Sequence, residues 1–201
     1  MPRSSDRRSP LALVLLALLA EEPMHPYRMQ QVIKTRGKDR IANVAQRNSV
    51  YQTIDRLLRT GLITVDDTER DERRPERTIY SLTGDGEAAL REWTRSMLAA
   101  PRREFPEFPA ALASVMLLDP ADALVQLEAR MEVLREEIAA LRADLASVPD
   151  LPRLFLLDDE YQVAVLEAEL TWLGPVVASL RDGSLTWSLD WIREVAESLE
   201  G

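Results

Sequence analysis

The chain contains no cysteine, one histidine and only 7 glycines among its 201 residues. The absence of cysteine excludes disulfides, thiol redox chemistry, cysteine nucleophiles and cysteine-based zinc sites. A catalytic triad or a histidine-metal site would have to include His25. His25 precedes Pro26 at a predicted helix start, where capping or packing is a commoner role. Phosphate loops and dinucleotide-binding glycine motifs are also lacking, so we expect no enzyme, no cofactor and no metal.

The net charge of −9 disfavours a general nucleic-acid coat, but the charge is unevenly distributed. Residues 1–100 hold 17 Lys and Arg against 14 Asp and Glu, whereas residues 101–201 hold 8 against 20. Residues 28–59 hold 8 basic and 2 acidic side chains. Phosphate would attract this basic segment and repel the acidic half, which predicts a DNA-binding N-terminal region and a different role for the rest.

The apolar run LALVLLALLA at 11–20 follows three arginines and superficially resembles a signal peptide. Ten residues are too few to span a bilayer, and two glutamates follow at once. A buried helix over about 10–21 fits better, with Ser9 as N-cap and Pro10 at the first helical position. We therefore expect a cytoplasmic protein with no membrane partner.

Residues 48–82 predict a helix, a glycine stop and a charged β-hairpin. Val50, Ile54, Leu57 and Leu58 recur at helical spacing and predict a buried stripe. Gly61 suits a left-handed C-cap. Strands are predicted at 62–65 and 78–82, followed by a helix over 84–99. A helix with one polar, cationic face and a following hairpin can place the helix in a major groove and the hairpin along the backbone.

The first residues of a recognition helix usually reach base edges, which here predicts contacts from Asn48, Ser49 and Gln52. Glutamine and asparagine can each bond adenine through two hydrogen bonds. Ser49 and Gln52 also match a capping box, which leaves capping open as the alternative for Ser49. The Tyr51 ring would pack at the edge of the buried stripe, with its hydroxyl within reach of a phosphate.

Clustered arginines predict the contacts with phosphate. On the helix these are Arg47, Arg56 and Arg59, and at the hairpin tip they are Arg73 and Arg74. The hairpin segment 66–77 also carries six acidic side chains and has a net charge of −2. The tip therefore contacts DNA only if its arginines project from it; otherwise it is a solvated loop.

The second half is predicted to be all-helical. After prolines between 101 and 109, a short helix is expected over about 109–118, and Asp119-Pro120 begins a long one. Its apolar residues alternate in steps of three and four, which is typical of a coiled-coil or dimer seam. The seam residues are Leu124, Leu127, Met131, Leu134, Ile138, Leu141 and Leu145.

Further helices are expected after Pro152. One has a second apolar repeat from Val163 to Leu180, and Pro175 is expected to kink it near Thr171. A last helix is expected over about 185–200. Tryptophan combines a large apolar ring with one hydrogen-bond donor, so the four tryptophans favour packing by default and an aromatic ligand pocket as the alternative. These are Trp93, Trp172, Trp187 and Trp191.

Three motifs in order resemble the PadR family of bacterial transcription regulators. HPYRM at 25–29 is similar to the family's start of its second helix. NSVYQTIDRLLRTGLI at 48–63 resembles its recognition helix, and RTIYSLTGDGEAAL at 77–90 resembles the segment that closes its wing. The helical second half is similar, in length and pattern, to the longer subgroup with a virulence-activator-type C-terminal domain.

The resemblance implies a homodimer joined through C-terminal helices that binds a two-fold operator, usually as a repressor. It also implies that Tyr51 contacts the DNA backbone and that family members respond to small aromatic compounds. Two positions depart from the family pattern. Asn48 stands where the family has glycine, and Gln52 where it has proline, so no base preference carries over.

These observations predict a mainly α fold with a small β-hairpin. We expect an N-terminal winged helix-turn-helix domain over 1–100 and an all-helical dimerisation domain over 101–201, which could also sense a ligand. The function expected is a sequence-specific DNA-binding regulator, a repressor acting as a homodimer on a pseudo-palindromic operator. Its partners would be double-stranded DNA, a second copy and a small aromatic effector. The alternative is a helical protein–protein adaptor that uses the winged helix as a scaffold.

Overall fold

The computed structural model describes residues 8–42, 47–69 and 77–199. The chain divides into two compact units, Met1–Arg103 and Glu104–Gly201. Each unit is described by itself. The described chain is mainly helical with one two-stranded antiparallel sheet, which confirms the predicted fold class.

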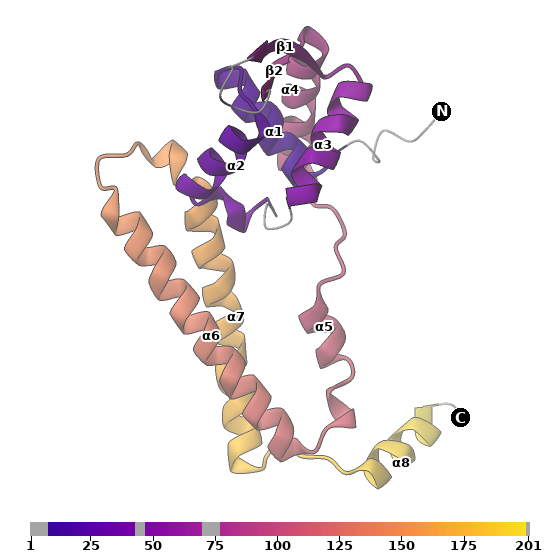
Figure 1. Cartoon of the computed structure of the whole chain (residues 1–201). Helices are drawn as coiled ribbons and strands as arrows, with labels where there is room; N and C mark the ends of the chain where they lie inside the picture. Colours follow the sequence, from indigo (N-terminus) through magenta and orange to yellow (C-terminus); the bar gives the residue numbers. More distant parts are fainter. Residues whose placement is uncertain (1–7, 43–46, 70–76, 200–201) are drawn as a thin grey trace. The chain divides into compact units, whose positions relative to one another are not determined.

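The described residues of the first unit form α-helices and a β-hairpin (Figure 1). Three helices precede the sheet: α1 (Pro10–Glu21), α2 (Pro26–Thr35) and α3 (Arg47–Arg59), with a short 3-10 turn η2 (Lys38–Arg40) between α2 and α3. Strands β1 (Ile63–Glu69) and β2 (Arg77–Leu82) follow, and α4 (Gly84–Ala99) closes the unit. Helix α1 begins as predicted, because the Ser9 hydroxyl accepts a hydrogen bond from the Ala12 N–H at 3.1 Å.

The core of the first unit is assembled around α1, whose apolar residues are buried on most sides of the helix. Leu15 and Leu16 are fully buried, as are Met29 and Ile33 of α2 and Ile54 of α3. Helices α3 and α4 and strand β2 all contact α1. A central apolar helix of this kind allows the remaining helices to turn their polar faces outward.

The hairpin pairs Ile63 with Leu82 and Glu69 with Arg77, with an irregularity between Val65 and Asp67. Both strands extend further toward the tip than the predicted ranges. Gly86 is required where α4 passes the hairpin, because a Cβ atom there would lie 2.0 Å from the Leu62 carbonyl oxygen. The Thr83 hydroxyl fixes the same junction by accepting from the Gly86 N–H at 3.0 Å and donating to the Gly61 carbonyl at 2.7 Å.

The second unit contains helices and connecting loops but no strand among its described residues. Its short elements are α5 (Glu107–Leu112), η3 (Val115–Leu117) and η4 (Arg153–Phe155), and its long helices are α6 (Pro120–Ser147) and α7 (Leu157–Asp182). The last described helix is α8 (Leu189–Leu199). The short helix expected over 109–118 is thus shorter and begins earlier, and α8 begins four residues later than predicted. Pro175 lies inside α7, which continues through it.

Helices α6 and α7 form an antiparallel pair (Figure 1). Leu127 and Leu134 of α6 are buried in one cluster with Leu173, Val177 and Leu180 of α7. Two residues of the predicted seam on α6 therefore pack against α7 of the same chain. Contact of these seam residues with a second chain stays a prediction.

Helix α7 is long and apolar enough, by length and composition alone, to cross a membrane. A helix that packs in the core of a soluble protein passes the same test, and α7 is paired with α6. Ion pairs also join the two helices, between Arg142 and Glu167 and between Arg181 and Glu128. These side chains are exposed, so the pairs contribute little to stability.

Candidate nucleic-acid interface

Helix α3 has two chemically distinct faces. Val50, Ile54 and Leu57 are buried in the core of the first unit. Thr53 is the one buried polar residue on this face, and its hydroxyl donates to the Ser49 carbonyl at 2.7 Å. The exposed residues are Asn48, Tyr51, Gln52, Asp55, Leu58 and Arg59. The core thus fixes which side of α3 a nucleic acid can meet.

Leu58 is a correction to the predicted buried stripe. Its side chain is 36% exposed, whereas the neighbouring Leu57 is 1% exposed. Helical spacing cannot decide which of two consecutive leucines faces the core when both lie near its edge. Thr53 lies on the buried face instead.

The C-terminus of α3 is closed as predicted. Gly61 adopts φ of +71°, a conformation in which glycine avoids a Cβ clash. The Leu62 N–H donates to the Leu57 carbonyl and the Gly61 N–H to the Leu58 carbonyl, both at 3.0 Å. This Schellman arrangement ends the helix and turns the chain directly into β1.

The N-terminus of α3 differs from the capping-box alternative. The helix begins at Arg47, so Ser49 lies inside the first turn and not at the N-cap. Ser49 is half-buried, whereas Asn48, Tyr51 and Gln52 are exposed. The structure therefore brings these three side chains together on one open face, and it does not test their contact with DNA.

Arg56 is held inside the first unit. Its side chain is half-buried, and its Nη2 donates to the Ser9 hydroxyl at 3.1 Å. A contact between residues so far apart in sequence leaves no local signal. Arg59, by contrast, is exposed, and toward the described part of the chain it makes a long hydrogen bond from Nε to the Asp55 carbonyl, at 3.4 Å. Of the two arginines, Arg59 is the more accessible to phosphate.

The side chains of three arginines predicted to contact phosphate are not described. Arg73 and Arg74 fall within 70–76, and the side chain of Arg47 is likewise not described. Beside α3, burial raises the pKa of the Tyr80 hydroxyl on β2, and the nearby carboxylate of Asp55 raises it further. Tyr80 therefore keeps its proton and remains a hydrogen-bond donor at neutral pH.

The sequence analysis did not single out α2, which presents a basic surface. The His25 Nδ1 caps the helix by accepting from the Arg28 N–H at 3.1 Å, which confirms the capping role. A shallow hollow of about 580 Å³ lies on α2. It is lined by Arg28, Gln31, Val32, Lys34, Thr35 and Arg36. The positive charge of residues 28–59 is the sequence signal that could have pointed to this surface.

The four tryptophans differ in burial and in the elements that carry them. Trp93 is buried in the core of the first unit. Trp172 and Trp191 are both about half exposed, and the Trp187 Nε1 donates to the Leu118 carbonyl at 2.9 Å. The structure thus places these side chains on different helices and loops, and a pocket lined by tryptophan stays a prediction.

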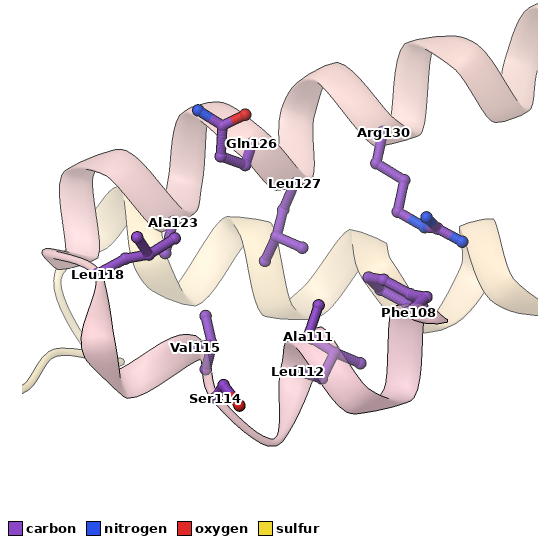
Figure 2. A pocket seen from close by; sticks show the side chains of 10 residues that line it. All are labelled: Phe108, Ala111, Leu112, Ser114, Val115, Leu118, Ala123, Gln126, Leu127 and Arg130. Carbon is purple, nitrogen blue, oxygen red and sulfur yellow. The ribbon is translucent and has the colours of Figure 1, made fainter. Parts of the chain in front are cut away.

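A different hollow lies in the second unit, between α5, η3 and α6 (Figure 2). Its volume is about 250 Å³. No tryptophan lines it. The lining residues are Phe108, Ala111, Leu112, Ser114, Val115, Leu118, Ala123, Gln126, Leu127 and Arg130. Among the described residues, no group of three or more His, Asp and Glu side chains could hold a metal ion.

A known protein family matches the first unit of the chain, and solved structures resemble both units. Residues 15–92 match the model of the transcriptional regulator PadR-like family. No curated protein sequence matches the chain. The match covers α3 and the hairpin, with α1 from Leu15 and α4 to Glu92.

Solved structures resemble both units. Bacillus subtilis PadR in complex with p-coumaric acid has a TM-score of 0.68 at 17% identity, covering 86% of this chain and 99% of that one. The same regulator in complex with operator DNA has a TM-score of 0.67 at 18% identity, covering 85% and 98%. The Vibrio cholerae virulence activator AphA has a TM-score of 0.65 at 22% identity, covering 86% and 98%. At these identities the likeness shows the fold.

Proposed function

We propose, from the premise that residues 15–92 form a PadR-like transcriptional regulator domain, that this protein binds duplex DNA and regulates transcription. The observation that carries the proposal is the two-faced α3, which is buried along Val50, Ile54 and Leu57 and open along Asn48, Tyr51 and Gln52. A helix of this width fits a major groove, where hydrogen-bond patterns distinguish all four base pairs. The likeness to a PadR structure in complex with operator DNA supports this function.

Each exposed side chain of α3 has a proposed role. Asn48 and Gln52 read base edges, because each carries one donor and one acceptor that match adenine. Tyr51 and Arg59 contact the phosphate backbone, as do Arg47, Arg73 and Arg74. Ser49 contacts a base edge from the same turn of α3. Arg56 donates a hydrogen bond to the Ser9 hydroxyl and so stabilises the position of α3. It contacts a phosphate only if this hydrogen bond breaks.

The basic face of α2 adds a second contact with the backbone. In helix-turn-helix proteins the helix before the recognition helix crosses the phosphate backbone. Lys34 and Arg28 lie in the hollow on α2, and Arg28 is 3.9 Å from Glu22. Each phosphate contact would steepen the salt dependence of binding by about one unit of log–log slope.

We further propose that the protein acts as a homodimer. Tyr161, Val165, Ala168 and Trp172 are exposed on α7 and follow one another at steps of four, three and four. They form an apolar stripe over three turns of a helix whose other apolar side is filled by α6. A second copy that covers this stripe would pair two α3 helices on a pseudo-palindromic operator, and a regulator bound there would act as a cytoplasmic repressor.

A small aromatic effector is the remaining part of the proposal. The structure of PadR in complex with p-coumaric acid motivates it. The expected consequence is a change in operator affinity when the effector binds, since allosteric coupling is typically 5- to 150-fold, or about 1–3 kcal/mol.

The experiment that tests the function is a gel-shift titration with the DNA upstream of the protein's own coding sequence, with random DNA as competitor. Wild-type protein should shift this DNA tightly at low salt and more weakly at high salt. Replacing Arg59 with Ala should weaken binding to all sequences, whereas replacing Gln52 with Ala should change preference at one base pair by about 1–3 kcal/mol. Absence of any shift at low salt would overturn the proposal in favour of a protein–protein adaptor.

A further inference from the structure

The hollow between α5, η3 and α6 has mostly apolar walls (Figure 2). Phe108 and Leu112 come from α5, Val115 from η3, and Ala123 and Leu127 from α6. An apolar cavity of about 150 Å³ holds benzene. The hollow, at about 250 Å³, therefore has room for a molecule of one or two rings.

The charge of the hollow is set by one side chain. Arg130 is the one cation among the lining residues, and its Nε donates to the Glu169 carboxylate of α7 at 2.5 Å. Its guanidinium lies over the Phe108 ring, 3.6 Å from the ring centroid. Because Glu169 neutralises Arg130, a carboxylate ligand would have to displace Glu169 before it could pair. An uncharged ligand meets no such obstacle and can hydrogen-bond to Ser114 or Gln126.

The elements around the hollow are the first ones after the boundary between the two units along the chain. Helix α5 has only six residues, and it is the first helix after α4 along the chain. On the other side, η3 is tied to the segment before α8 by the hydrogen bond from the Trp187 Nε1 to the Leu118 carbonyl. A ligand in contact with α5, η3 and α6 would hold these elements together.

We propose that this hollow binds an uncharged, largely apolar molecule of one or two rings, and that this binding regulates the affinity for DNA. The regulatory half of the inference rests on the function proposed above, and the binding half does not. The site is built from α5, η3 and α6, and the ligand charge follows from the pairing of Arg130 with Glu169.

The binding half is tested with two probes of the same ring system on the full-length protein. At pH 7, 2-naphthol is neutral because a phenol has a pKa near 10, whereas 2-naphthoate is an anion because carboxylic acids ionise near pH 4. Titration followed by the methyl NMR signals of Val115, Ala123 and Leu127 should show saturable shifts with 2-naphthol and at least a 10-fold weaker response with 2-naphthoate. No shift with 2-naphthol, as when a second copy fills the hollow, would overturn the site.

A matched pair of variants on α5 locates the ligand. Ala111 lines the hollow and Ala110 does not, and both are exposed. Ala111→Phe should fill the space and abolish the shifts, whereas Ala110→Phe should leave the affinity for 2-naphthol within 2-fold of wild type. Circular dichroism of both variants checks that they fold. Equal affinities in the two folded variants would overturn the location.

The preference for an uncharged ligand is tested with a separate variant. Glu169→Gln leaves Arg130 without its carboxylate partner, so the affinity for 2-naphthoate relative to 2-naphthol should rise at least 5-fold. Glu167→Gln is the control, because Glu167 also pairs with an arginine of α6, Arg142, which does not line the hollow. An unchanged ratio in Glu169→Gln would overturn the role of Glu169 in selecting an uncharged ligand.

The regulatory half is measured by gel shift with and without saturating 2-naphthol. Operator affinity should change at least 5-fold in wild type and Ala110→Phe, and not in Ala111→Phe. Saturable 2-naphthol binding without a change in operator affinity would overturn regulation alone. If no DNA is bound under any condition, the proposed function fails, while the methyl titrations still decide whether the hollow binds its ligand.

Discussion

The two units of this chain use apolar side chains in opposite ways. The first unit, which contains α3, buries most of its large apolar residues around α1, and few of them are exposed. The second unit buries a narrow seam between α6 and α7 and leaves many large apolar side chains exposed, among them Phe105, Leu154 and Tyr161.

The difference shows what each unit needs in order to be stable. Exposed apolar surface is ordinary when it is scattered, but a contiguous patch marks an interaction site. The stripe Tyr161–Val165–Ala168–Trp172 follows one face of α7 over three turns, whereas the exposed apolar residues of the first unit are few and scattered over several elements, with only the pair Tyr51 and Leu58 on one helix face. The first unit is therefore expected to be stable by itself, and the second to depend on a partner.

Removing the second unit should have the largest effect. A chain of residues 1–103 should be monomeric, because it lacks the α7 stripe. Two linked DNA-binding modules bind about 10²- to 10⁴-fold more tightly than one, so operator affinity should fall at least 100-fold. Sedimentation velocity and gel shift measure the two effects. A truncated dimer that binds at full strength would contradict the role assigned to the second unit.

The self-contained core of the first unit can be tested with two neighbouring leucines. Leu57→Ala should lower the free energy of unfolding by about 3 kcal/mol, because it removes a fully buried side chain and leaves a cavity. Leu58→Ala should lower it by less than about 1 kcal/mol, since Leu58 is partly exposed. Urea unfolding at several protein concentrations gives both values. Comparable losses in the two variants would place Leu58 in the core after all.

Sequence reasoning succeeded where the cause is local. The start of α1 depends on Ser9 and Pro10, and the end of α3 on Gly61, so each could be predicted from a few adjacent residues. The apolar repeat of α6 was equally visible because one helix carries it, and its part in dimerisation stays a prediction. The fold class and the PadR resemblance over residues 15–92 were confirmed for the same reason.

The candidate sites were harder to predict because they depend on contacts between distant residues. No local pattern indicates that Arg56 bonds Ser9, or that Glu169 neutralises Arg130. The apolar stripe on α7 was not predicted, because the sequence analysis considered only the apolar repeat from Val163 to Leu180 on that helix. The tryptophans were grouped by residue type, whereas the structure places Trp93 and Trp172 in different units.

The partner dependence of the second unit can be tested at the centre of the α7 stripe. Val165→Asp should weaken dimerisation by about 2 kcal/mol, or roughly 30-fold, because it buries an unpaired charge in an apolar interface. The matched control is Ala178→Asp, since residue 178 is exposed on α7 but lies beyond the end of the stripe and off its face. Sedimentation equilibrium measures the dissociation constants. Equal dissociation constants for the two variants would move the dimer interface away from this face.

The smallest expected effect concerns an ion pair within the first unit. The Arg36 guanidinium bonds both carboxylate oxygens of Glu21 at 2.6 Å, and this pairing lowers the pKa of Glu21 below its ordinary value of 4.5. A carboxyl with a lowered pKa in the folded state binds its proton more weakly than in the unfolded state. Its contribution to stability is therefore present above about pH 4.5 and is lost as the pH falls through the lowered folded value.

Both side chains of this pair are about half exposed, so solvent screening limits the contribution to less than about 1 kcal/mol. The measurement is the difference in unfolding free energy between wild type and Glu21→Gln from pH 7 to pH 3, because the other carboxylates cancel in that difference. The difference should be constant above about pH 5 and shrink below it. If Arg36→Gln leaves that pH dependence intact, another cation sets the pKa of Glu21, and the pair is not the link between the end of α1 and the end of α2.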